Sequence, residues 1–305
     1  MQLKWLDDFL VLAAERSFTR AAELRHVTHP AFGRRIRALE AWAGTPLVER
    51  DGGGPVRLTP AGQAFVETAG QMARNLAQSH GELQAIAGRQ ARTVTLATGR
   101  TLSRTVVADL LVRLRPQLGD GELRIITRSL AAAVDELQRG EADFSLIYHH
   151  PTLVVPLDAR QFAHLTVATD RLVPLARADA SGAPVFRFGA AGSDAAAAAA
   201  VPYIAYSRSL ALGRLVEDHL ANHRAAPRLK QLVECDSPDA HLEYALRGLG
   251  VTWLPWSMAH AETQAGRLAL AGDKRMEIRF DVRMYRPKRR LGPLAEALWA
   301  QMARR

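Results

Sequence analysis

Arginines recur along one side of a short amphipathic segment near the start of the chain, residues 29–40. Three apolar residues of this segment are spaced i, i+4 and i+7 and so share one face of a helix, namely Phe32, Ile36 and Leu39. Pro30, Arg34 and Arg37 fall on the opposite face. Exposed guanidinium groups bind phosphates and can donate two parallel hydrogen bonds to guanine. The spacing therefore predicts a helix with one face in a core and a cationic face open to a polyanion.

A second short helix is expected just before this one. Thr28 occupies an N-cap position ahead of the apolar repeat, and a short helix at Thr19–Leu24 would be separated from it by a turn at Arg25–Val27. This is the spacing of a helix-turn-helix, whose second helix lies in the major groove of DNA. Leu3–Glu15 carries an apolar stripe and should form a further helix. The sequence thus predicts double-stranded DNA as a partner.

The residues after these helices predict a wing. Gly44 and Pro46 end helical structure, and short apolar runs then flank the turn DGGGP at residues 51–55. A hairpin in this position brings its basic residues, Arg50 and Arg57, next to phosphates. We therefore expect a winged helix-turn-helix domain over residues 1–59.

The expected DNA contacts come from the helices and the wing. Base edges should be approached by His29, Pro30 and Arg34. Phosphates should be bound by Thr19, Thr28, Arg37, Arg50 and Arg57. Gly33 belongs to the same surface but lacks a side chain that could reach a phosphate. Arg35 lies nearer to the core edge, where a local ion pair is expected.

A long helix should follow, over residues 60–89. Thr59 and Pro60 supply an N-cap and a first-turn proline. Seven residues then recur every three or four positions, namely Phe65, Ala69, Met72, Leu76, Ser79, Leu83 and Ile86. At 1.5 Å per residue, the segment to Gly88 would be about 43 Å long. Such a seam can pack on its own domain or on a second copy, and we favour a dimerising helix because helix-turn-helix proteins usually bind paired half-sites.

From Arg92 onward the pattern changes to alternating strands and helices. Strands are expected at Thr93–Ala97, Leu123–Thr127, Asp143–Tyr148, Phe162–Leu175, Val201–Tyr206, Leu229–Cys235, Val251–Leu254 and Arg279–Tyr285. Helices are expected at Thr101–Arg115, Leu130–Arg139, Leu210–His223, Pro238–Arg247 and Leu291–Met302. Repeated βαβ units imply a parallel sheet with helices on both faces. The Gly/Ala-rich stretch 181–200 is expected to be a surface loop.

The fold class expected for residues 90–305 is therefore an α/β effector domain of two lobes. We assign 91–162 and 268–305 to lobe I and 163–267 to lobe II, with a ligand cleft between them. The candidate effector contacts in lobe I are Thr101, Leu102, Ser103, His149 and His150. Those in lobe II are Ser207, Arg208 and Ser237. Arg208 is best suited to a carboxylate or oxyanion, although surface or capping duty is open for each.

Other reactive side chains have a plainer interpretation. Cys235 is the only cysteine, which excludes an intramolecular disulfide, and a buried, inert thiol is expected. His219 and His223 are spaced for chelation but lack a third ligand, so we expect no metal. Trp253 and Trp256 should line the core or the cleft. No cofactor is expected, because the G-x-S-x-G, Walker and G-x-G-x-x-G motifs are absent.

Composition sets the remaining bounds. A chain of 305 residues with 48% hydrophobic residues can form two or three domains. No run of 18 apolar residues occurs, and the acids of MQLKWLDDFL are unlike an export signal, so we expect a cytoplasmic protein without a membrane partner. The net charge of +9 favours an anionic partner. Residues 16–50 hold seven Arg against three Glu, whereas the ten Lys or Arg of residues 270–305 are interpreted as a solvated surface.

The chain resembles the LysR-type transcriptional regulators over its whole length. The most specific matches are F-T-R-A-A-x-L at 18–24, P-A-F-G-R-R-I-R-A-L-E at 30–40 and L-T-P-A-G at 58–62. The resemblance implies a winged helix-turn-helix, a linker helix and a two-lobed domain like a periplasmic binding protein. KWLDDFLVL, HPAFGRRIRALE, AYSRSLALGRL and GVTWLP are similar to the hypochlorite-responsive (HypT-like) subgroup.

Two departures from the family pattern bear on function. Family members usually carry Gln and Ser where this chain has His29 and Gly33, so its preferred base sequence is expected to differ. The subgroup is associated with methionine oxidation, yet YSRSLALGRL contains no Met, which argues against oxidant sensing there.

Together these observations predict a transcription factor. We expect it to bind an operator as a homodimer or homotetramer, under the control of a small anionic effector or an oxidative signal sensed in the C-terminal domain. RNA polymerase is a further candidate partner. The alternative is an α/β ligand-binding or enzymatic domain fused to a DNA-binding head, but the cleft lacks paired acids and we do not expect an enzyme.

Overall fold

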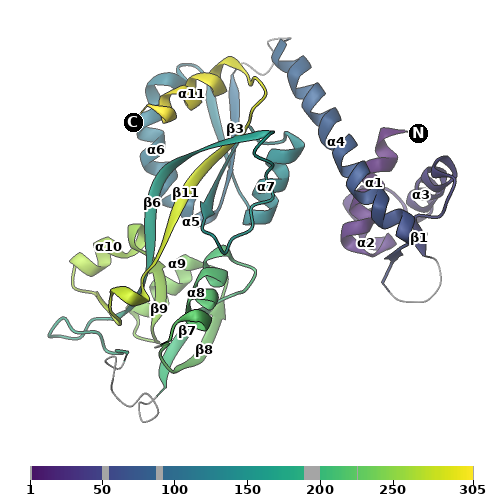
Figure 1. The fold of residues 1–305 in the computed structure, drawn as a ribbon. Coiled ribbons are helices and arrows are strands. Elements are labelled where there is room, and N and C mark those ends of the chain that lie inside the picture. Colours follow the sequence, from purple (N-terminus) through teal and green to yellow (C-terminus); the bar gives the residue numbers. More distant parts are fainter. Residues whose placement is uncertain (1, 50–54, 87–91, 189–199, 225, 305) are drawn as a thin grey trace. The chain divides into compact units, whose positions relative to one another are not determined.

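The computed structural model describes residues 2–49, 55–86, 92–188, 200–224 and 226–304 (Figure 1). The chain forms two compact units, Met1–Ile86 and Ala87–Arg305, called here the N-terminal and C-terminal units. Among the described residues, no helix is both long and apolar enough to cross a membrane.

Three short helices build the core of the N-terminal unit. They are α1 (Leu3–Glu15), α2 (Phe18–Leu24) and α3 (His29–Ala43). The predicted apolar face of α3 lies in this core, where Phe32, Ile36 and Leu39 are at most 1% exposed. Ser17 caps α2 by accepting a hydrogen bond from the Arg20 backbone at 3.3 Å, so this helix begins one residue earlier than expected. The predicted helix-turn-helix is confirmed.

The hairpin and the long helix are joined by a close backbone contact. Strands β1 (Val48–Glu49) and β2 (Arg57–Leu58) pair antiparallel, and α4 (Pro60–Ile86) follows. The Thr59 hydroxyl donates to the Pro46 carbonyl at 2.8 Å and accepts from the Gly62 backbone at 3.0 Å. A Cβ atom on Gly62 would lie 2.0 Å from the Leu47 carbonyl oxygen. The L-T-P-A-G motif thus docks the start of α4 against the segment that leads into the wing.

The first part of the α4 seam packs on its own unit, and the second part does not. Phe65 lies 5.5 Å from the ring of Phe9, and Ala69 is fully buried in the core of its own unit. Further along, the side chains of Met72, Leu76 and Leu83 are 40%, 45% and 64% exposed. The side chain of Ile86 lies outside the described part. The second half of the seam therefore leaves an apolar surface unpaired within this chain.

The C-terminal unit is built around a mixed β-sheet. Its strands are β3 (Thr93–Thr98), β4 (Glu122–Thr127), β5 (Phe144–His149), β6 (Phe162–Arg177), β9 (Thr252–Pro255), β10 (Leu268–Leu270) and β11 (Ile278–Pro287). The order is β10-β6-β11-β5-β3-β4, with β9 paired to β6. Only β3, β4 and β5 are parallel, because β11 runs antiparallel to both β5 and β6. The expectation of a purely parallel sheet was wrong.

Lobe I packs helices on both faces of this sheet (Figure 1). These helices are α5 (Arg100–Arg104), α6 (Val106–Leu118), α7 (Leu130–Arg139) and α11 (Pro293–Ala303). Leu96 belongs to the core cluster formed with α6 and α11, whereas its neighbour Ala97 belongs to the cluster formed with α7. This is the alternation that strand geometry requires. The single helix expected over Thr101–Arg115 is two helices, α5 and α6, which are separated at Thr105.

Lobe II is built around a small second sheet. Parallel strands β7 (Val201–Tyr206) and β8 (Leu229–Cys235) form it, and α8 (Ala211–Asn222), α9 (Pro238–Leu246) and α10 (Trp256–Gln264) accompany it. A 3₁₀ turn at Lys274–Met276 leads into β11. The long strands β6 and β11 run through both lobes and connect them (Figure 1). Of the expected loop at 181–200, residues 189–199 lie outside the described part of the chain, and Phe188 is buried against Trp253.

Candidate nucleic-acid interface and effector site

The outer face of α3 is exposed and cationic. Thr28, His29, Pro30, Arg34 and Arg37 are all exposed. Within the described residues Arg34 pairs with no acid, and Arg37 contacts only the Gly33 carbonyl, with Nε 3.3 Å away. Thr28 stands at the N-cap position, but its side chain makes no capping hydrogen bond. Its hydroxyl is thus available to a ligand such as a phosphate.

A buried carboxylate holds this face in position. Asp8 of α1 is fully buried, and one of its oxygens accepts a hydrogen bond from Arg25 Nε at 2.8 Å. The other accepts from Arg35 Nη1 at 3.2 Å, which confirms the ion pair expected for Arg35. One acid therefore ties the three helices together through arginines that point inward. Arg34, the residue before Arg35 in the sequence, is exposed on the outside of α3.

The remaining candidate DNA contacts differ in their location and surroundings. Thr19 is exposed in the first turn of α2, and Arg57 is exposed on β2 of the wing. Arg50 lies outside the described residues. A Cβ on Gly33 would meet nothing closer than Arg37 Nη2 at 3.8 Å, so packing does not require glycine there. His29 packs its ring edge against Phe18 at 5.9 Å, which restricts the imidazole at the start of α3.

The lobe I effector candidates gather near the ends of β3 and β5. Thr101 and Leu102 are buried in α5, and Ser103 is half-buried. His149 is the last residue of β5 rather than a residue beyond it, and burial together with Arg283 lowers its pKa. The His150 ring bonds Thr152 Oγ1 at 2.8 Å.

The lobe II candidates already have partners within the chain. Arg208 is 84% exposed and pairs with Glu217 at 2.5 Å. The Ser207 hydroxyl lies 3.0 Å from that of Ser209. Ser237 caps α9 by accepting from the Ala240 backbone at 3.4 Å.

Two tyrosines that the sequence did not single out belong to one core cluster with residues from both lobes. Tyr148 on β5 and Tyr206 at the end of β7 are 8% and 6% exposed, and both hydroxyl oxygens are buried without a hydrogen-bond partner among the described residues. Burial raises the pKa of both phenols, and the Thr101 side chain acts on the pKa of Tyr148 in the opposite direction. An unpaired buried hydroxyl costs about 1–3 kcal/mol. Such groups are uncommon in folded proteins.

Charged and aromatic groups frame these two hydroxyls. Arg104 of α5 forms an ion pair with Asp239 of α9, and this pair bridges the lobes. The His241 ring stacks on Tyr206 with 3.8 Å between centroids and 8° between planes. Its Nε2 lies 3.1 Å from the Cys235 carbonyl and must therefore donate, while its Nδ1 accepts from Thr252 Oγ1 at 2.7 Å. Burial lowers the pKa of His241 to about 4, so the ring is neutral.

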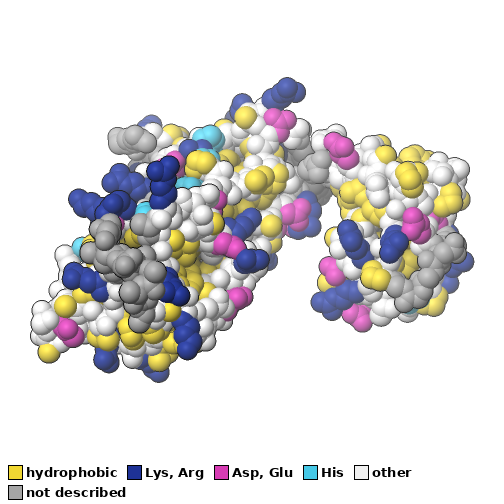
Figure 2. Space-filling view, turned by 60° about the horizontal axis from the view of Figure 1, so that its bottom comes forward, with side chains coloured by type: hydrophobic (Ala, Val, Ile, Leu, Met, Phe, Trp, Pro, Cys, Tyr) yellow, Lys and Arg dark blue, Asp and Glu magenta, His cyan; other side chains and the backbone are white. Residues whose placement is uncertain are grey.

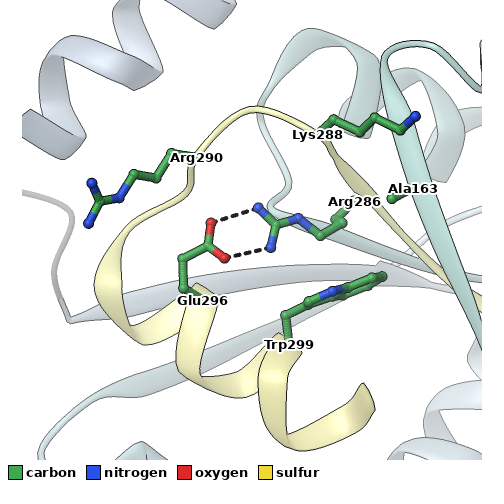
Figure 3. A pocket seen from close by; sticks show the side chains of 6 residues that line it. All are labelled: Ala163, Arg286, Lys288, Arg290, Glu296 and Trp299. Atoms are coloured by element: carbon green, nitrogen blue, oxygen red, sulfur yellow. Dashed lines mark hydrogen bonds and ion pairs between the residues drawn. The ribbon is translucent and has the colours of Figure 1, made fainter.

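A surface hollow of about 600 Å³ lies elsewhere, at the C-terminal end of β11 (Figure 3). Arg286 is 7% exposed there, and its two terminal nitrogens each lie 2.7 Å from a Glu296 oxygen. Its other donors reach the Pro287 and Arg289 carbonyls at 2.9 Å, and Trp299 lies 5.4 Å beneath the guanidinium. With its hydrogen bonds already made within the chain, Arg286 joins β11 to α11 and is not a free anion site.

The structure also places Trp253, Cys235 and the pair His219 and His223, which the sequence analysis had singled out. Trp253 is fully buried and donates to the Met276 carbonyl at 2.8 Å, as a core residue. Cys235 is half-buried rather than fully buried. The rings of His219 and His223 lie 5.2 Å apart, and no group of three potential metal ligands occurs among the described residues.

Comparison with known proteins decides the family. Residues 87–305 match the LysR substrate binding domain, and residues 3–63 match the bacterial regulatory helix-turn-helix protein, lysR family. The chain belongs to the LysR family. It is 29% identical over 302 residues to the HTH-type transcriptional regulator YjiE of Escherichia coli (strain K12), covering 99% of this chain and 94% of the relative. This LysR-type protein is thus a DNA-binding transcriptional regulator with a substrate-binding domain.

Solved structures of LysR-type regulators show the same architecture. Vibrio fischeri DarR in complex with DNA is 28% identical, with a TM-score of 0.59, and the match covers 100% of this chain and 99% of that one. Full-length HypT from Salmonella typhimurium, a hypochlorite-specific regulator, is 26% identical with a TM-score of 0.58 over 99% and 97% of the two chains. The predicted fold class, a helix-turn-helix domain followed by a two-lobed α/β domain, is confirmed.

Proposed function

We propose that this regulator binds duplex DNA through the exposed face of α3 and the wing. The observation that carries the proposal is the opposite orientation of neighbouring arginines, since Arg35 is committed to Asp8 while Arg34 and Arg37 face outward. His29, Pro30, Gly33 and Arg34 would approach base edges, and the exposed threonines and wing arginines would bind phosphates. The net charge of +9 and the Lys and Arg side chains spread over the visible C-terminal unit suit a polyanionic partner (Figure 2).

Substitution of Arg34 tests this proposal. We expect Arg34→Ala to weaken specific binding by about 1–3 kcal/mol and to flatten base preference, because a base-directed guanidinium is lost. The operator would be obtained by selection from random duplexes and binding measured by fluorescence anisotropy. Arg113→Ala, an exposed arginine on α6, is the matched control and should bind as the wild type does. Equal loss of affinity for operator and random DNA in Arg34→Ala would remove Arg34 from the base-contacting set.

The second part of the proposal concerns control by a small molecule. An effector held where β5 and β7 end would contact both lobes and so bias their relative arrangement. The ion pair Arg104–Asp239 spans this junction and would be broken or remade as the lobes move. We place the effector there, together with Thr101, Leu102 and Ser103, in preference to Arg208, which is turned toward Glu217.

Methionine oxidation is less well supported as the signal. The four methionines of the C-terminal unit, Met258, Met276, Met284 and Met302, are each at most 6% exposed. Oxidants react most readily with accessible sulfur. We therefore favour reversible binding of an effector over methionine oxidation as the signal. The regulator would act in the cytoplasm, as a homodimer or homotetramer bound at a promoter. RNA polymerase would be a further partner there.

A further inference from the structure

Two arginines next to the exposed face of α3 are paired with acids of α1. Arg25 lies in the turn that leads into α3, and Arg35 lies on α3 directly after Arg34. Asp8 accepts hydrogen bonds from both guanidinium groups, at 2.8 Å from Arg25 Nε and at 3.2 Å from Arg35 Nη1. Asp7 adds an ion pair with Arg25 at 3.4 Å. These two acids and two arginines thus form one cluster whose formal charges cancel.

The carboxylate of Asp8, rather than close packing, keeps both cations turned inward. The side chain of Asp8 is fully buried, whereas those of Arg25 and Arg35 are 30% and 28% exposed. Because more than a quarter of each arginine side chain is already at the surface, either guanidinium could turn to solvent if the charge of Asp8 were lost. The positions of Arg25 and Arg35 therefore depend on one acid of a different helix.

A charged cluster is not needed to join these helices. Removing a carboxylate from water costs free energy that its ion pairs repay only in part, and well-packed apolar residues of similar size often stabilise a fold as well or better. The three helices already share an apolar core, which contains Phe9, Phe32 and Ile36. What Asp8 adds, and an apolar residue could not, is control over the position of two positive charges beside a polyanion.

This control bears on how the protein selects a DNA sequence. Every cation that reaches a phosphate tightens binding to any duplex, and the counterions that it releases make the binding dependent on salt. Arg34 and Arg37 are exposed, and among the described residues neither is paired with an acid. Holding Arg25 and Arg35 back limits the number of phosphate contacts. A larger share of the affinity then comes from base edges, which differ between sequences.

We propose that Asp8 determines the specificity of DNA binding by withholding Arg25 and Arg35 from phosphates. The acid thereby widens the difference in affinity between the operator and a random sequence. This inference rests on the proposed function, in which the exposed face of α3 binds DNA. It gives α1, which supplies none of the proposed DNA contacts, a role in discriminating between sequences.

The test measures how binding of the full-length protein to operator and to random duplex depends on salt. We expect Asp8→Asn, which keeps the shape of the side chain but removes its charge, to release both arginines onto phosphates. For random duplex, the slope of log K against log salt concentration should steepen by about 1.8, because each added phosphate contact contributes about 0.9. The loss of affinity for random duplex between about 50 and 200 mM salt should therefore grow about 10-fold, and the preference for operator should fall.

Two further variants separate this role from a loss of packing. Glu67→Gln removes the same charge from an exposed position on α4 and should keep the wild-type slope. When Asp8→Asn is combined with Arg25→Gln and Arg35→Gln, the released cations are gone and the slope should return to the wild-type value. If Asp8 only stabilised the fold, Asp8→Asn would lose operator binding without a steeper slope, and the combined variant would be no better.

Chemical modification of the wild type gives a test that does not depend on the folding of Asp8→Asn. Phenylglyoxal, which reacts with accessible guanidinium groups, would be applied with and without random duplex, and the modified residues identified by mass spectrometry. We expect Arg34 and Arg37 to react readily and to be protected by DNA. Arg25 and Arg35 should react slowly, at rates that DNA does not change.

Two results would overturn the proposal. One is a wild-type slope for random duplex in a folded Asp8→Asn protein, and the other is protection of Arg35 by DNA equal to that of Arg34. Operator binding by the wild type is measured in parallel. A wild type that binds no operator contradicts the proposed function itself, whereas intact operator binding confines a failure to this inference.

Discussion

At the scale of single residues, the neutral imidazole of His241 makes stability depend on pH. Burial lowers the pKa of His241 to about 4, whereas the ring in the unfolded chain titrates near its ordinary pKa of 6.5. Between these values the unfolded chain binds more protons than the folded chain, so stability falls as the pH falls. We expect His241 to lower the free energy of unfolding of the C-terminal unit by about 3 kcal/mol between pH 7 and pH 4. Urea denaturation at a series of pH values would measure this change. His241→Gln keeps a neutral donor and acceptor and should show a weaker dependence, whereas an identical pH profile would contradict the assignment.

Single residues also show which parts of the candidate sites could be predicted from the sequence and which could not. Arg34, Arg35 and Arg37 could be assigned from helical spacing, because one face of α3 had to be apolar. Tyr148 and Tyr206 could not, since each lies in a strand where a tyrosine passes as ordinary core. What distinguishes them is a hydroxyl without a partner, and that depends on side chains contributed by distant segments.

At the scale of elements, two glycines in helices are expected to respond in opposite ways to substitution by alanine. A Cβ on Gly62 would lie 2.0 Å from the Leu47 carbonyl oxygen, whereas a Cβ on Gly33 would meet only Arg37 Nη2 at 3.8 Å, an ordinary contact distance. We expect Gly62→Ala to destabilise the N-terminal unit by about 2 kcal/mol or more, because α4 must move away from the segment before the wing. Gly33→Ala should instead stabilise it by up to about 1 kcal/mol through helix propensity. Urea denaturation would compare the two, and a stable Gly62→Ala protein would contradict the close contact.

Element boundaries were predictable where local pattern alone decides them. The bounds expected for α7, β7 and β8 agree with the structure, because turn residues and apolar periodicity coincide at their ends. The break at Thr105 was missed, since its neighbours continue a helical apolar pattern on both sides. The antiparallel course of β11 was missed for a different reason. It pairs with β5 and β6 more than a hundred residues away, and no local signal specifies the direction of such a partner.

At the scale of the whole molecule, the exposed half of the α4 seam predicts self-association. Met72, Leu76 and Leu83 are at least 40% exposed on a helix whose earlier seam residues pack against the core of their own unit. Exposed apolar side chains repeated along one helix face are typical of a surface that a second copy covers. Two copies of the N-terminal unit would then present two α3 helices to paired half-sites.

Substitutions on this seam test the association and its link to DNA binding. We expect Leu76→Glu to raise the dimer dissociation constant at least about 10-fold, because a charge would have to be buried between helices. Asn75→Glu places the same charge on an exposed neighbouring position and should leave association unchanged. Sedimentation equilibrium gives both constants. Because paired half-sites require paired heads, Leu76→Glu should also bind a full operator about as weakly as a single half-site. If Leu76→Glu dissociates but keeps full operator affinity, DNA binding does not depend on this seam, and another surface must hold the two heads together.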